Sequence, residues 1–224
     1  MKQQEIFDFP EAVRLDWSDF IESEENREAI MYLAGWPNWS GNGLIICGES
    51  GTGKTHLAAL WAQTAGAVYV LKESLNYSPR DLFEAECNFV IDNFDDLTGR
   101  KNYEWMFDFL NISVEKNRFF LILSRTHPSA RDIEPEDLKS RLFALPCVSI
   151  RPPEDDLLLK VSKKIAGDLG MTLSDDVMLC ILNIIDRRVT AVADVLRTLN
   201  KLSLRRKKSL TAAFVKSCLK DSNS

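Results

Sequence analysis

The sequence predicts an α/β protein in which a base, built on a five-stranded parallel sheet, is followed by a small helical domain. Short apolar runs alternate with helical patterns over the first two thirds of the chain, and a glycine-rich loop joins the first run to a helix. A proline pair then precedes a stretch with helical periodicity alone. We expect an extended N-terminal tail over 1–12, the base over 13–151 and a helical lid over 152–224.

The base is predicted from runs that are apolar throughout, as in strands buried on both faces of a parallel sheet. The predicted strands are 43–47, 67–71, 89–91, 119–123 and 147–150. Helical segments separate them, around 56–62, 79–85, 103–115 and 135–143. This alternation predicts a parallel sheet with helices on both faces.

The lid begins at Arg151-Pro152-Pro153, because a proline pair cannot continue a strand ladder and disfavours a helix before it. Beyond it, apolar residues recur at three- and four-residue spacing. Four helices are predicted, over 157–168, 174–186, 189–201 and 211–220.

The glycine-rich loop reads GESGTGKT and fits G-x-x-x-x-G-K-[ST], a phosphate-binding loop placed between a strand and a helix. Its glycines let backbone N–H groups approach phosphate oxygens closely. Lys54 would reach the β and γ phosphates, and the Thr55 hydroxyl would ligate Mg²⁺. The predicted nucleotide-binding residues are Gly48, Glu49, Ser50, Gly51, Thr52, Gly53, Lys54 and Thr55, with ADP or ATP as the ligand.

Two further strand ends carry candidate site residues. Asp92 follows the run 89–91 and is the second predicted Mg²⁺ ligand. The next residue is Asn93, whose amide is a poor base, so intrinsic hydrolysis should be slow. Ser124 ends the fourth predicted strand and is expected to sense the γ-phosphate; the alternative is a simple turn. The pair Asp95-Asp96 is expected to have turned away and to cap the following loop.

Arg141 lies late in the helix that precedes the fifth strand. An arginine there can project from the edge of a subunit into a neighbour's nucleotide site and stabilise charge on a transferring phosphoryl group. The alternative is an ordinary arginine favoured by the C-terminal end of a helix dipole. The sequence leaves both open.

Composition and charge limit the partners and the cellular compartment that we expect for the protein. The 224 residues carry a net charge of −5, which does not suggest a general nucleic-acid binder. The first ten residues are no signal peptide, and no apolar run is long enough to cross a bilayer. Five scattered cysteines without a C-x-x-C pair indicate reduced thiols. We therefore expect a cytoplasmic protein without membrane contact. Whether the basic run 205–208 touches DNA, and whether the chain forms homo-oligomers, stays open.

These segments together resemble the AAA+ ATPases, and more narrowly the group formed by the replication initiator DnaA and the shorter Hda family, which inactivates it. The resemblance spans the chain from about Trp17 onward. Asn93, directly after Asp92, is similar to the Hda family in particular. The matching segments are GESGTGKTHL at 48–57, VIDN at 90–93, SRTHP at 124–128, DLKSRL at 137–142 and LTAAFVK at 210–216.

The resemblance implies a function as well as a fold. It implies a nucleotide-binding AAA+ regulator that promotes hydrolysis of DnaA-bound ATP together with the DNA-loaded sliding clamp, the β subunit of DNA polymerase III. Arg141 would act in trans as the arginine finger, and contact with DNA would be indirect. Replication initiation would thereby be negatively regulated. The alternatives are a helicase loader of the DnaC type and an autonomous P-loop ATPase.

The two ends of the chain carry the remaining expectations. Gln3, Ile6 and Phe7 are similar to the short motif by which Hda-like proteins dock on the clamp; they could instead fold back on the protein's own core. The lid arginine of the group aligns near Thr190, so either that contact is lost or Arg187 or Arg188 replaces it. The chain stops after the lid, so no sequence-specific DNA-binding helix-turn-helix is expected.

Overall fold

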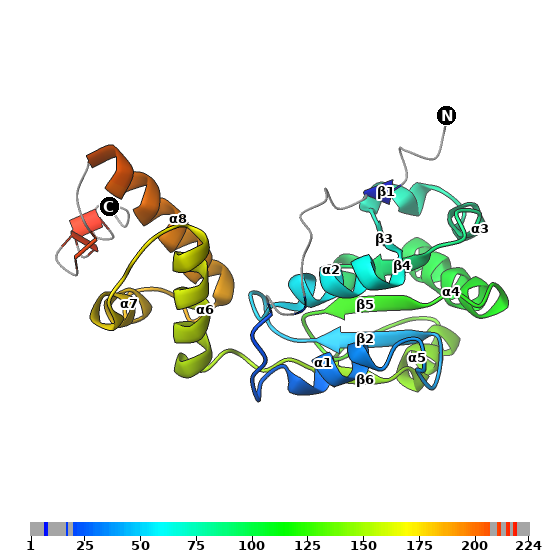
Figure 1. Cartoon of the computed structure of the whole chain (residues 1–224). Coiled ribbons are helices and arrows are strands. Elements are labelled where there is room, and N and C mark those ends of the chain that lie inside the picture. The colour runs from blue at the N-terminus through cyan, green and yellow to red at the C-terminus, as the bar shows by residue number, and fades with distance from the viewer. Residues whose placement is uncertain are drawn as a thin grey trace. The chain divides into compact units, whose positions relative to one another are not determined.

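The computed structural model of the protein describes residues 7, 8, 17, 20–206, 210, 211, 214, 215, 217 and 218. These residues divide by contact into two compact units, one comprising 1–49 with 53–150 and the other 50–52 with 151–224. Each unit is described by itself (Figure 1). Within this part of the chain, every helix is too short or too polar to span a bilayer.

The first unit is built on one six-stranded sheet whose strand order is β1-β3-β4-β5-β2-β6. Its strands are β1 (Phe7–Asp8), β2 (Gly43–Cys47), β3 (Ala67–Val70), β4 (Asn88–Ile91), β5 (Phe120–Ser124) and β6 (Cys147–Ser149). All pairs among β2 to β6 are parallel, which confirms the five predicted strands. The two-residue β1, which the sequence did not predict, adds an antiparallel edge strand through the pairs Phe7–Val70 and Asp8–Tyr69.

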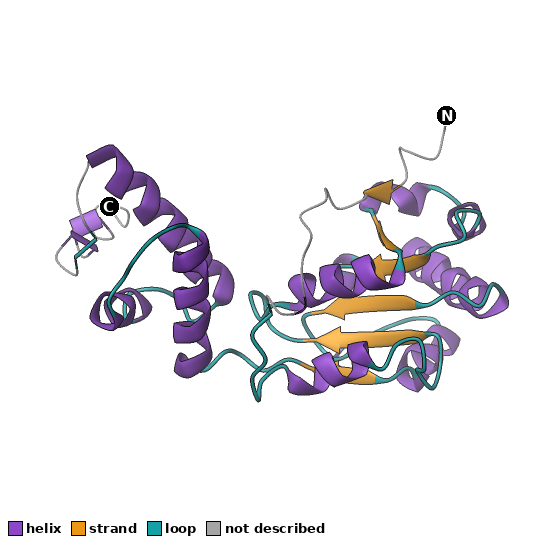
Figure 2. Cartoon of the chain, in the orientation of Figure 1, coloured by secondary structure: helices purple, strands orange, loops and turns teal. Residues whose placement is uncertain are grey.

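Helices cover both faces of the sheet (Figure 2). They are α1 (Arg27–Ala34), α2 (Lys54–Ala65), α3 (Pro79–Phe83), α4 (Arg100–Glu115) and α5 (Glu136–Ala144), with 3₁₀ turns η2 (Lys72–Asn76), η3 (Phe94–Asp96) and η4 (Pro128–Ala130). Of the helices, α1 was not predicted. On one face, α1 and α2 pack on alternate strand residues such as Leu44 and Ile46. On the other, α3, α4 and α5 pack on Ile45 and Ile122. The unbroken apolar runs are thus explained by burial on both sides.

The second unit is helical and has its own apolar core. Its helices are α6 (Asp155–Asp168), α7 (Asp175–Leu182) and α8 (Val189–Arg206). Leu158, Ile181 and Leu196, one from each helix, are all 2% exposed or less and pack together. The fourth predicted helix, over 211–220, lies largely outside the described residues, although Val215 and Cys218 belong to the same core.

Candidate nucleotide-binding site

The strand order determines which loops meet at the carboxyl edge of the sheet. Strand β5 lies between β2 and β4, so the glycine-rich loop after β2 and Asp92 after β4 flank the end of β5. A backbone hydrogen bond from the Gly48 N–H to the Ser124 carbonyl, at 3.1 Å, ties the start of the loop to β5. Ligand sites of parallel α/β sheets form at this edge.

The loop ends at Gly53, whose φ of +97° is a left-handed conformation at the N-cap of α2. A glycine adopts it without the steric cost that a Cβ would bring. The first helical residue is Lys54, which is only 9% exposed. The N-terminus of α2, with its free backbone N–H groups, therefore opens next to a buried ammonium group, an arrangement that suits phosphate oxygens.

The side chain of Lys54 bends back over the glycine-rich loop. Its Nζ donates hydrogen bonds to the carbonyl oxygens of Gly48, at 2.6 Å, and Glu49, at 2.9 Å. Burial lowers the pKa of this ammonium group, while the carboxylates of Asp92 and Asp95 act in the opposite direction. Partial desolvation strengthens the attraction between the lysine and an incoming anion.

Thr55 and Asp92, the two residues expected to bind Mg²⁺, are in hydrogen-bond contact. The Thr55 hydroxyl donates to Oδ2 of Asp92 at 3.0 Å, and the backbone N–H of Asn93 donates to Oδ1 at 2.7 Å. Both side chains offer hard oxygen ligands, which fit Mg²⁺. Among the described residues, no group of three His, Cys, Asp or Glu side chains could hold a metal ion. A pair of ligands completed by phosphates and waters is how Mg²⁺ is commonly bound.

Asn93 has a local structural role. Its φ of +54° is a left-handed conformation, which asparagine tolerates better than most residues. Its side chain is exposed beside Asp92. Both residues line a hollow of about 330 Å³ that also includes Tyr69. Burial raises the pKa of the Tyr69 hydroxyl, and the charge of Asp92 raises it further.

Ser124 is placed between the two phosphate-binding elements, as expected, but its side chain is 1% exposed and already engaged. Its hydroxyl is within hydrogen-bond distance of Oδ1 of Asp95, at 3.1 Å, and of the Thr126 carbonyl, at 2.7 Å. A role in sensing phosphate stays a prediction. In the described arrangement, Ser124 joins two strand ends.

Asp95 was expected only to cap the loop that follows it, and this expectation was wrong. Its carboxylate also accepts the Arg125 N–H at 2.5 Å and the Thr126 hydroxyl at 3.1 Å, so it connects the segment after β4 to the segment after β5. Arg131 reinforces the connection from η4, because its guanidinium donates to the carbonyls of Phe94, Asp95 and Leu97 at 2.9 to 3.1 Å. The sequence carried no signal for either contact.

The remaining predicted residues fall elsewhere. Arg141 is exposed in the last turn of α5, and its guanidinium lies 5.1 Å from the ring centroid of Phe107 on α4. Ser50, Gly51 and Thr52 form the tip of the loop, and Gly51 has a φ of +82°. Gln3 and Ile6 lie outside the described residues, as does the side chain of Phe7.

In the lid, Thr190 is exposed at the start of α8. Its neighbours are engaged within the same unit: Arg187 pairs with Asp155 at 3.2 Å and Arg188 with Asp186 at 2.6 Å. These pairs involve exposed side chains and contribute little to stability.

Comparison with known proteins shows which families the chain resembles. Residues 155–219 match the family model described as Hda, lid domain. The chromosomal replication initiator protein DnaA of Methylibium petroleiphilum is 25% identical over 215 residues, covering 87% of this chain and 46% of the relative. The second unit is thus similar to the lid domain of the Hda family, and the chain as a whole is similar to DnaA.

Further comparisons extend the similarity. An uncharacterized protein of Haemophilus influenzae is 29% identical over 184 residues, covering 78% of this chain and 80% of the relative. Domain III of the Thermotoga maritima DnaA has a TM-score of 0.76 at 19% identity, covering 91% and 95% of the two chains. AMPPCP-bound DnaA from Aquifex aeolicus has a TM-score of 0.68 at 20% identity, covering 82% and 64%. The chain thus spans about two thirds or less of the longer DnaA relatives. Its fold is that of the DnaA AAA+ domain.

Proposed function

We propose that this protein binds ADP or ATP with Mg²⁺ and promotes hydrolysis of ATP bound to DnaA, acting together with the DNA-loaded sliding clamp. The observation that carries the proposal is Arg141. It is exposed at the end of α5, rests against the ring of Phe107, and has no hydrogen bond or ion pair within the described part of the chain. An arginine exposed in this way is available to a partner's nucleotide, and the similarity to the Hda lid domain suggests DnaA as that partner.

The protein's own nucleotide site would serve to hold its structure. Lys54 would bind the phosphates, and Thr55 and Asp92 would hold Mg²⁺. When bound, Mg²⁺ neutralises phosphate charge. Ligand binding to the folded state alone stabilises that state. With the amide of Asn93 beside Asp92, we expect intrinsic hydrolysis to be slow, because an amide cannot accept a proton from water.

Nucleotide binding is tested by titrating the purified protein with fluorescent ADP and ATP, with and without Mg²⁺. Lys54→Ala should weaken binding by about 100-fold, on the scale of losing a charge-assisted phosphate contact. Lys160→Ala, an exposed lysine of α6 paired with Asp156, is the control. Unchanged affinity in Lys54→Ala would contradict this half of the proposal.

At the partner's site, Arg141 would place a positive charge on the phosphoryl group during transfer, which is worth about 10³-fold or more in rate for arginine fingers. The test measures hydrolysis of DnaA-bound ATP with clamp-loaded DNA and this protein. Wild type should accelerate it, and Arg141→Ala should not. Arg80→Ala, another exposed arginine of the same unit, is the control.

The clamp contact is proposed for Gln3, Ile6 and Phe7, and Gln3→Ala should abolish the acceleration while leaving nucleotide binding intact. The backbone of Phe7, in β1, pairs with Val70 of β3. If the wild-type protein leaves DnaA-bound ATP untouched but binds a replicative helicase, the helicase-loader alternative replaces the proposal.

A further inference from the structure

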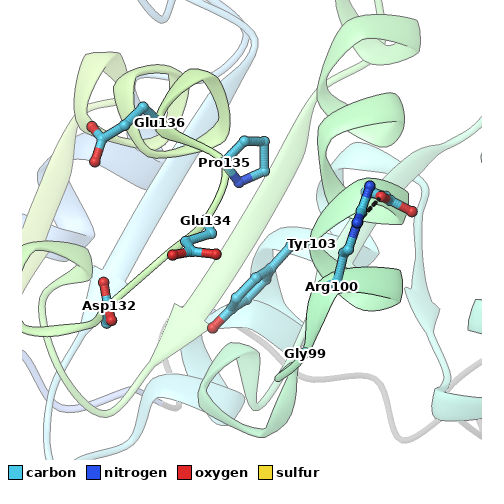
Figure 3. A pocket seen from close by; sticks show the side chains of 8 residues that line it. Gly99, Arg100, Tyr103, Asp132, Glu134, Pro135 and Glu136 are labelled. Carbon is cyan, nitrogen blue, oxygen red and sulfur yellow. Dashed lines mark hydrogen bonds and ion pairs between the residues drawn. The ribbon is translucent and has the colours of Figure 1, made fainter.

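A second hollow lies on the first unit, between the start of α4 and the start of α5 (Figure 3). Its volume is about 580 Å³, within the range of ligand-binding pockets. We call it the acidic hollow. The lining side chains that matter here are Arg100, Tyr103, Glu104, Asp132, Glu134 and Glu136. It shares no residue with the hollow beside Asp92.

The charges of the acidic hollow do not balance. Arg100 pairs with Glu104 at 2.7 Å, and Lys139 pairs with Glu136 at 3.2 Å. Asp132 and Glu134 have neither an ion pair nor a hydrogen bond to any residue that the structure describes. Asp132 and Glu134 therefore leave the lining with two uncompensated negative charges, which would attract a bound cation.

Tyr103 is the second, independent observation. It is 8% exposed, so more than nine tenths of it is buried, yet its hydroxyl has no hydrogen-bond partner within the described ranges. Figure 3 shows its hydroxyl directed into the hollow, on the side of Asp132 and Glu134. A buried phenol that keeps its polar end in a pocket offers a ring edge, a donor and an acceptor to a ligand.

The walls of the acidic hollow are fixed by the core. Ile133, between the two unpaired acids, is 1% exposed and belongs to the apolar cluster that also contains Tyr103 and Leu138. The acids therefore sit on an anchored segment. A site held in place before binding loses little free energy to ordering.

We propose that the acidic hollow binds an arginine side chain of a partner protein. A planar guanidinium can donate to two carboxylates at once and stack on an aromatic ring. The described residues offer no group of three acids placed to hold a metal ion, and the negative lining excludes nucleic-acid phosphates. The hollow opens at the start of α5, and Arg141 lies in the last turn of the same helix. The whole of α5 is about 13 Å long. A protein docked along α5 would cover both.

The test uses the full chain and a defined probe, the peptide acetyl-Gly-Arg-Gly-Arg-Gly-amide, followed by NMR shifts of the isotope-labelled protein at low salt. A peptide with citrulline in place of arginine keeps the shape and removes the charge. We expect saturable shifts at the starts of α4 and α5 with the arginine peptide, weakened by added salt, and none with the citrulline peptide.

Variants distinguish binding in the acidic hollow from non-specific attraction of the peptide to the protein's negative charge. Asp132→Asn combined with Glu134→Gln should weaken peptide binding by about tenfold or more, and Tyr103→Phe by a few-fold. Asp108→Asn, an exposed acid of α4 outside the hollow, should bind as wild type does. Equal binding by the double variant, or equal binding of the citrulline peptide, would overturn the proposal. So would stronger binding of spermidine in the hollow, which would assign it to a free polyamine.

The inference goes beyond the proposed function and can fail separately from it. Arg141→Ala should bind the arginine peptide with unchanged affinity, because Arg141 does not line the hollow. A protein that fails to accelerate hydrolysis of DnaA-bound ATP but binds the peptide through Asp132 and Glu134 would contradict the proposed function alone. The opposite pair of results would contradict the hollow alone.

Discussion

The hydroxyl of Ser124 lies 3.1 Å from the carboxylate of Asp95, and this contact joins the segment after β4 to the end of β5. Together with the Arg125 N–H and the Thr126 hydroxyl, it gives Asp95 three neutral hydrogen-bond donors. The carboxylate is only 10% exposed. This largely buried carboxylate thus holds together the ends of β4 and β5, and β5 lies next to β2, the strand that leads into the phosphate-binding loop.

The first prediction concerns the stability of this connection. Asp95→Asn turns one acceptor oxygen into an NH₂ group facing donors, so the free energy of unfolding should fall by about 2 kcal/mol. The neighbouring Asp96, which is 69% exposed, is the matched control, and Asp96→Asn should cost less than about 0.5 kcal/mol. Urea denaturation measures both. Equal losses in the two variants would show that Asp95 is not special.

The second prediction is a pH dependence. Burial raises the pKa of Asp95, but the hydrogen bonds from Arg125, Ser124 and Thr126 outweigh it, and its pKa in the folded protein lies below 3.8. An acid with a lowered folded pKa stabilises the protein fully above its unfolded value, and this contribution is lost as the pH falls through the folded pKa.

The difference in unfolding free energy between wild type and Asp95→Asn should therefore stay constant at neutral pH and shrink below pH 3.8. Urea denaturation at a series of pH values measures it. A difference that is flat, or that grows on acidification, would contradict the lowered pKa.

The third prediction tests Arg131. Its guanidinium donates to three backbone carbonyls, of Phe94, Asp95 and Leu97, and lies 4.9 Å from the centre of the Phe94 ring. A lysine keeps the charge but cannot reproduce the planar fork. Arg131→Lys should lower the free energy of unfolding by about 1 to 3 kcal/mol, since buried carbonyls lose partners. Arg197→Lys, at an exposed arginine of α8, should change it little.

These contacts show what the sequence could predict. The five parallel strands were predicted because each is an apolar run buried on both faces. Thr55 and Asp92 were each proposed as Mg²⁺ ligands, Thr55 from the glycine-loop motif and Asp92 from its place after an apolar strand. Strand β1 has two residues, too few for a pattern. Asp95 contacts residues 29 to 31 positions away, across neighbouring strands, and no local spacing encodes such a pairing.

The acidic hollow illustrates the same limit. Tyr103 and Ile133 are both buried, and neither was singled out from the sequence. Only the packing of α4 beside the segment before α5 brings Tyr103 together with the unpaired Asp132 and Glu134. The first acidic residues of α5 would by themselves be explained by the helix dipole. The charge imbalance becomes visible once the partners of each acid are known.

The last prediction concerns how Arg141 is held for a partner. Its guanidinium lies over the ring of Phe107, and a cation over an aromatic face is attracted by about 0.5 to 1 kcal/mol at exposed sites. Phe107→Leu keeps the apolar bulk and removes the ring. If Arg141 acts on DnaA-bound ATP, this change should lower the stimulated hydrolysis about two- to fivefold, with nucleotide binding by the variant unchanged. Val114→Ala, at an exposed apolar residue of the same helix, is the control. Full stimulation by Phe107→Leu would show that the ring does not position the arginine.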